Sequence, residues 1–210
     1  MSLLEEAIAA HGGIQRWHEV ETIEVALRCG GIAMPAKRRP GVLANLRATV
    51  DPRRPHVELH GLGTFDAARP RPAGIARRTR WTDEDVVHFA GYALWGYMTA
   101  PFVFADDDVL VRELPRRRLR VDFPARIPSH SRRQTFHFDE NAVLIRLDYT
   151  AEVFLGSLGR AKHVCRDHRW IDGLLVATSR RVTPRGLPAP TLVSIEIDEF
   201  SAGSAGDAGS

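Results

Sequence analysis

The sequence predicts an α+β fold built mainly on a curved antiparallel β-sheet with one face open to solvent. Short segments in which apolar and polar residues alternate recur along the chain, as in strands with one buried face. Thirteen prolines and 17 glycines favour many turns over long helices. The chain has 210 residues and a hydrophobic content of 44%, which suits one domain with a large core. We assign residues 1–200 to this domain and expect the Gly/Ala/Ser-rich tail 201–210 to be disordered.

The first element is a short helix. Ser2 can cap a helix through Leu3–Ile8, and acidic residues in its first turn suit the helix dipole. His11-Gly12-Gly13 ends this helix, because glycine adopts the left-handed conformation that stops helices. Trp17 and Val20 follow, and we expect them to pack under the first strand.

Alternating apolar and polar residues then predict strands over residues 20–29, 41–50 and 56–60. The Arg69–Pro72 segment is predicted to be a loop, because two prolines interrupt it. After the helical segment described next, alternation resumes over 118–123. These segments make up the first half of the predicted sheet.

One longer helix is predicted over residues 82–100. Thr82 is a good N-cap, three acidic residues follow it, and the helix should end before Pro101. We expect this helix to be buried over the sheet. One of its faces carries side chains with polar tips: His88, Tyr92 and Trp95.

The apolar stretch from Val86 to Phe104 is long enough to cross a bilayer. Two glycines and Pro101 interrupt it, and its N-terminal flank is acidic rather than basic, so we expect no transmembrane segment. The N-terminus lacks the pattern of a secretory signal. These observations predict a cytoplasmic protein with Cys29 and Cys165 reduced.

The charge pattern argues against nucleic-acid binding. The formal net charge is only +3, and acidic residues lie between and around the arginine clusters. No aromatic-rich recognition motif accompanies these clusters. We therefore expect no nucleic-acid partner.

The last third of the chain predicts two paired strands, 145–154 and 160–170, with charged residues on their outer face. Asp148 on the first strand and Lys162 and Arg166 on the second fit a solvent-facing side. The alternate positions should then face inward. These inward positions include four side chains that carry chemistry: Tyr149, His163, Cys165 and Asp167.

Three interpretations of this polar group remain open. His163, Cys165 and Asp167 could share a zinc ion, but no second ligand cluster accompanies them, so we assign no metal and no cofactor. A histidine beside a carboxylate and a tyrosine could instead move protons. The third interpretation is a hydrogen-bonded network that fixes strand register.

Three segments together resemble the superfamily of bacterial lipoprotein carriers, the LolA-like proteins. They are the opening helix with His11-Gly12-Gly13, the hairpin from Phe136 to Tyr149, and Asp167-His168-Arg169 with the following Ile171-Asp172-Gly173-Leu174. The resemblance implies an open half-barrel with helices covering its concave face and an acyl chain or similar apolar ligand inside. The chain departs from those carriers in its helical insert at 82–100 and in its N-terminus, which lacks the pattern of an export signal.

Our first hypothesis is a half-barrel that binds a hydrophobic small molecule or lipid-like ligand. Its pocket would have a wall of His88, Tyr92, Trp95 and Met98 and a polar floor of Tyr149, His163, Cys165 and Asp167.

The second hypothesis is a cofactor-independent enzyme that catalyses cyclisation, isomerisation or dehydration in the same cavity. His163 would be the general base, Asp167 its electrostatic partner and Tyr149 the donor to a developing oxyanion. A third hypothesis is peripheral contact of the segment 86–104 with a membrane surface or protein partner.

Overall fold

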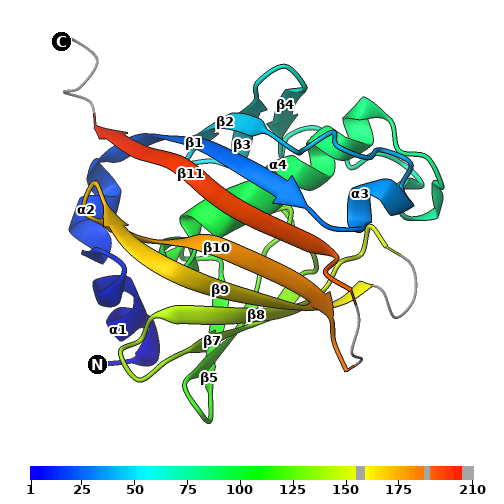
Figure 1. Cartoon of the computed structure of the whole chain (residues 1–210). Helices are drawn as coiled ribbons and strands as arrows, with labels where there is room; N and C mark the ends of the chain where they lie inside the picture. Colours follow the sequence, from blue (N-terminus) through cyan, green and yellow to red (C-terminus); the bar gives the residue numbers. More distant parts are fainter. Residues whose placement is uncertain (155–158, 187–189, 205–210) are drawn as a thin grey trace.

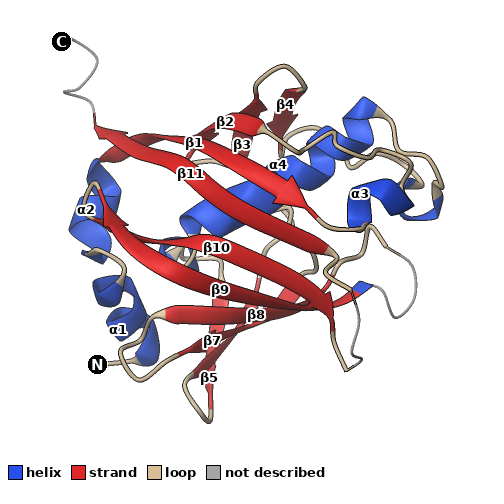
Figure 2. Cartoon of the chain, viewed as in Figure 1, coloured by secondary structure: helices blue, strands red, loops and turns tan. Residues whose placement is uncertain are grey.

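The computed structural model describes residues 1–154, 159–186 and 190–204, and within them all strands belong to one sheet (Figures 1 and 2). The helices are α1 (Leu3–Ala10), α2 (Gly13–Glu19), α3 (Ala33–Ala36) and α4 (Asp83–Thr99), with 3-10 turns η1 (Ile75–Arg77) and η2 (Phe102–Ala105). The strands are β1 (Val20–Gly30), β2 (Leu46–Asp51), β3 (His56–Leu59), β4 (Gly63–Asp66), β5 (Leu110–Leu114), β6 (Arg118–Asp122), β7 (Arg133–Phe138), β8 (Leu144–Thr150), β9 (Arg160–Ile171), β10 (Leu174–Pro184) and β11 (Val193–Ser204).

The sheet is antiparallel and curved, in the order β4-β3-β2-β1-β11-β10-β9-β8-β7-β6-β5. Its two ends, β4 and β5, are edges, so the sheet is an open half-barrel. Strands β1 and β11 bring the N-terminal and C-terminal parts of the chain together, because they pair from Val20 and Ser204 to Gly30 and Ser194. Figure 1 shows α4 running behind β1 and β11, on the inner side of the curve. The predicted α+β fold with helices over the concave face is confirmed.

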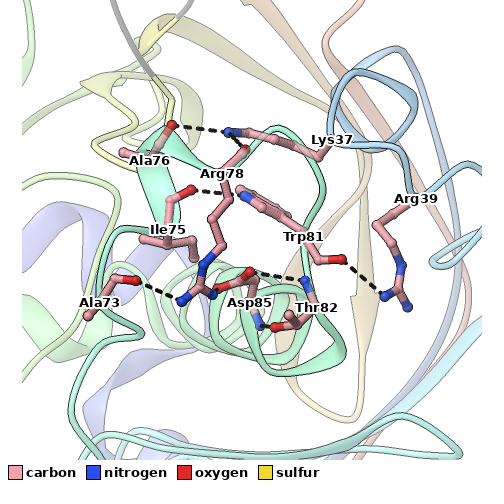
Figure 3. A network of polar contacts seen from close by, with 9 residues as sticks. All are labelled: Lys37, Arg39, Ala73, Ile75, Ala76, Arg78, Trp81, Thr82 and Asp85. Atoms are coloured by element: carbon pink, nitrogen blue, oxygen red, sulfur yellow. Dashed lines mark hydrogen bonds and ion pairs between the residues drawn. The ribbon is translucent and has the colours of Figure 1, made fainter.

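Helix α4 begins where the sequence predicts. The Thr82 hydroxyl accepts the backbone N–H of Asp85, and the Asp85 carboxylate accepts the backbone N–H of Thr82 (Figure 3). Asp85 is fully buried and forms an ion pair with Arg78. Burial alone would raise the pKa of Asp85, but the hydrogen bonds from Arg78 and Thr82 hold it below its usual value. These contacts fix the start of α4 under the sheet.

A second set of contacts ties α3 to the loop before α4 (Figure 3). The Lys37 ammonium donates to the carbonyl oxygens of Ala76 and Arg78 at 3.2 and 3.0 Å. It also lies 5.1 Å from the ring centroid of Trp81, whose indole N–H donates to the Ile75 carbonyl at 3.1 Å. Through this network α3 and the N-terminal end of α4 are held next to each other at one end of the half-barrel.

Several predicted boundaries were wrong. The strand expected over 41–50 starts only at Leu46, because Gly41 adopts a φ of +75° and the residues after it form turns. The predicted disordered tail 201–210 was wrong for its first four residues, since β11 continues to Ser204. Small side chains do not prevent this pairing, because backbone groups make the bonds to β1. Residues 205–210 lie outside the described part of the chain.

Among the described residues, no helix combines the length and apolar character needed to cross a bilayer. The same residues contain no cluster of three or more side chains that could hold a metal ion.

Candidate ligand-binding cavity

A cavity of about 100 Å³ lies between α4 and the concave face of the sheet. Leu27 of β1, Val182 of β10 and Ile195 of β11 line it from the sheet, and these three strands are neighbours. Phe89 and Leu94 line it from α4. The walls are therefore mostly hydrocarbon.

Alanines create much of this space. Six residues of the lining are alanines from four different parts of the chain: Ala33, Ala36, Ala90, Ala93, Ala151 and Ala161. Ala90 and Ala93 lie on the side of α4 that faces the hollow, and Ala161 lies on β9 opposite Tyr149 of β8. Larger side chains at these positions would fill the cavity.

A small polar group forms one side of the cavity. The Tyr97 hydroxyl lies 2.6 Å from Nε2 of His130 and 3.4 Å from the Tyr149 hydroxyl. The His130 ring stacks on Tyr149, with centroids 4.1 Å apart and an angle of 4° between the planes. Burial lowers the pKa of His130 to about 3 and raises that of Tyr97 above its ordinary value, so all three side chains are neutral near pH 7. The group offers hydrogen bonds to a ligand but no charge.

The predicted phase of β8 and β9 is correct over most of their length. Tyr149 pairs with Ala161, and Asp148 pairs with Lys162 on the outer face. His163 and Cys165 face inward and are 0% and 3% exposed. Tyr149 lines the cavity, where the sequence analysis expected it.

His163 does not reach the cavity. Its ring lies edge-on to Tyr97, with centroids 4.6 Å apart, and it is absent from the cavity lining. Neither ring nitrogen has a hydrogen-bond partner within the described residues, and burial holds the pKa of His163 well below its usual value. The position of His163 outside the cavity lining therefore does not favour a role as general base, which requires contact with the substrate.

Asp167 was expected to face inward, and this prediction was wrong. Its side chain is exposed, and its backbone adopts a φ of +52°. This local twist turns the side chain out of the alternation that holds as far as Cys165. Asp167 consequently belongs neither to the cavity floor nor to a pair with His163.

The predicted wall of α4 does not face the cavity of about 100 Å³. His88 packs edge-on against Phe65 of β4, and the Trp95 indole N–H donates to the Asp51 carbonyl of β2 at 2.9 Å. Tyr92 packs against His130, with ring centroids 5.1 Å apart, and lines another cavity of about 370 Å³ together with His88. Met98 lines a smaller cavity. None of these four residues lines the cavity of about 100 Å³.

Gly91 is the signal that could have identified the packed side of α4. A Cβ added there would lie 2.1 Å from the Phe65 Cβ, so a glycine is needed where the helix approaches β4. The face that includes Ala90, Ala93 and Tyr97 then points into the hollow. Sequence reasoning also missed His130, which lies in a loop with no alternating pattern.

Comparisons with known proteins give structural likenesses only. No family model and no curated protein matches the chain. A DUF1329 family protein from Desulfovibrio piger aligns with a TM-score of 0.47 and 11% identity, over 99% of this chain and 93% of its own. A LolA superfamily protein from Nitrosomonas europaea aligns with a TM-score of 0.44 and 9% identity, over 96% of this chain and 92% of its own. The second belongs to the superfamily that the sequence patterns resemble, and a likeness of fold does not establish a function.

Proposed function

We propose that this protein binds a hydrophobic small molecule or lipid-like chain in the cavity between α4 and the sheet. The observation that supports this most is an apolar hollow lined by buried hydrophobic side chains of the core. An unfilled cavity costs about 24 cal/mol per Å³, so about 100 Å³ costs roughly 2.4 kcal/mol. A ligand that filled the hollow would recover part of this free energy on binding.

The entrance lies beside α3. Ile32 lines the cavity and is also 42% exposed, so the hollow meets solvent at this residue. The backbone N–H groups of Ile32 and Ala33 donate to the carbonyl oxygens of Thr191 and Leu192, which joins the two sides of the rim. A hydrocarbon chain of a ligand that enters here would pass Leu192 and reach Ala93 and Tyr149.

The size of the cavity limits what it holds without rearrangement. Pockets for drug-sized ligands measure about 300–1,000 Å³, several times the volume here. Without rearrangement the cavity accommodates part of an acyl chain, and a longer ligand would leave its remaining atoms at the rim or displace side chains. The hydroxyl groups of Tyr97 and Tyr149 would orient a polar atom on the ligand.

Native mass spectrometry and thermal unfolding test this proposal. The protein as purified should carry a bound apolar species, or its melting temperature should rise with straight-chain ligands of increasing length. A protein that carries no such species, and that no ligand in a panel of fatty acids, alcohols and amides stabilises, would rule the function out.

A further inference from the structure

We propose that the ligand is an acid, and that Arg180 on the concave face binds its carboxylate. This inference rests on the proposed function, because it assigns the charged end of the molecule whose apolar chain occupies the cavity. Arg180 is 5% exposed and lies on β10, two residues before Val182 of the cavity wall. On one strand, such positions are about 6.6 Å apart and face the same side.

In the part of the chain that the structure describes, the guanidinium of Arg180 is a buried cation without an anionic partner. One terminal nitrogen donates to the Cys165 sulfur at 3.3 Å and the other to the Tyr97 carbonyl at 3.2 Å. Within the described residues, its Nε has no hydrogen-bond partner and no carboxylate forms an ion pair with the guanidinium. Sulfur and carbonyl contacts leave the charge uncompensated, and a buried unpaired charge costs several kcal/mol. A bound anion would remove this cost.

The space beside Arg180 suits a carboxylate. A second cavity of about 30 Å³ is lined by Arg180 together with Met98, Phe102 and Leu174. This is room for about two water molecules, and hence for two carboxylate oxygens rather than the larger phosphate group. Two histidines, His11 and His168, also line this cavity. Burial lowers the pKa of both, so neither competes for the anion as a cation near pH 7.

Tyr97 belongs to the walls of both cavities. It lines both of them, and its ring centroid lies 5.2 Å from the guanidinium carbon of Arg180. The ring therefore separates the apolar hollow from the cation. Rotation of this one side chain would let the ligand carboxylate reach Nε of Arg180, while the ligand's hydrocarbon chain stays in the alanine-lined cavity.

The test compares decanoate with decanamide, which has the same shape and no charge, and with decyl phosphate, by titration calorimetry. We expect the wild type to bind decanoate roughly 10- to 100-fold more tightly than decanamide, the usual effect of hydrogen bonds to a charged group. Arg180→Met should abolish this preference and retain decanamide binding. Arg181→Met is the matched control, because Arg181 is exposed on the opposite face of β10, and it should leave the preference intact.

Equal affinities for decanoate and decanamide in the wild type would overturn the assignment of Arg180 while the proposed function stands. Tighter binding of decyl phosphate than of decanoate would overturn the choice of a carboxylate. If none of the three ligands bound, the proposed function and this inference would both fail. Arg180→Met removes the desolvation cost of a buried charge and puts an unbranched apolar side chain in its place, so this variant should fold. The wild-type comparison decides the question even if that variant does not fold.

Discussion

A leucine in place of Ala93 should fill the cavity. Ala93 is 7% exposed and lies on the face of α4 that lines the hollow of about 100 Å³. Ala93→Leu adds three carbon atoms, which at about 0.8 kcal/mol each gain at most about 2.4 kcal/mol on burial. The loss of leucine rotamer freedom, about 0.5–1 kcal/mol, reduces the gain to roughly 1.5 kcal/mol.

The same substitution at a packed site should have the opposite sign. Ala7 of α1 is 0% exposed and lines none of the cavities described above. Ala7→Leu should cost about 1–3 kcal/mol, because the added carbons force neighbouring atoms apart. Urea unfolding at pH 7 of the wild type and both variants gives the two changes in free energy of unfolding.

Binding gives a second measurement on the same proteins. The new leucine occupies the space of the ligand, so Ala93→Leu should weaken binding of a straight-chain ligand at least about tenfold, while Ala7→Leu binds like the wild type. The reasoning is refuted if Ala93→Leu destabilises the protein as much as Ala7→Leu does. It is also refuted if a stable Ala93→Leu protein binds the ligand with unchanged affinity.

Three further predictions concern α4, His163 and Cys29, which lines the cavity. Gly91→Ala should lower the free energy of unfolding by about 1–3 kcal/mol, because the added Cβ would collide with Phe65. Gly96→Ala should raise it by up to about 1 kcal/mol, because no atom lies within 4 Å of the added Cβ. Equal effects of the two substitutions in urea unfolding would contradict the packing of α4 on β4. The folded-state pKa of His163 is well below 6.5, so the unfolded chain binds the extra proton and stability falls as pH drops below about 6.5. His163→Phe should flatten this fall by up to about 1.4 kcal/mol per pH unit, and melting curves at pH 7 and 5 that keep the wild-type difference would refute the assignment. Burial raises the pKa of Cys29 to about 12, so its alkylation at pH 8 should be at least about a hundredfold slower in the folded than in the unfolded protein, and similar rates would show an exposed thiol.

The fold could be predicted because local rules and tertiary packing agree over most of the chain. The capping pattern at Thr82 places the start of α4, and alternation around His163 and Cys165 places their side chains inside. Short elements such as α3 and β4, four residues each, carry too few residues for a periodic signal. Their positions depend on contacts with distant parts of the chain.

The candidate site was harder to predict than the fold, for two physical reasons. Helix α4 is apolar nearly all round, so its sequence does not indicate which face meets the hollow. The predicted face with His88 and Trp95 packs on β2 and β4, and the face with Ala93 lines the cavity. At Asp167 a positive φ ends the alternation of inward and outward side chains along β9. The sequence around this residue gives no sign of the change.

The central claim is that an apolar ligand binds between α4 and the sheet, and the position of a bound acyl ligand tests it most directly. A crystal structure with 10-bromodecanoate would place the bromine by its anomalous scattering. We predict one bromine peak between α4 and the sheet, beside Ala93 and Ile195. Bromine peaks found only on the outer face of the sheet, with the inner cavity unchanged, would contradict the account.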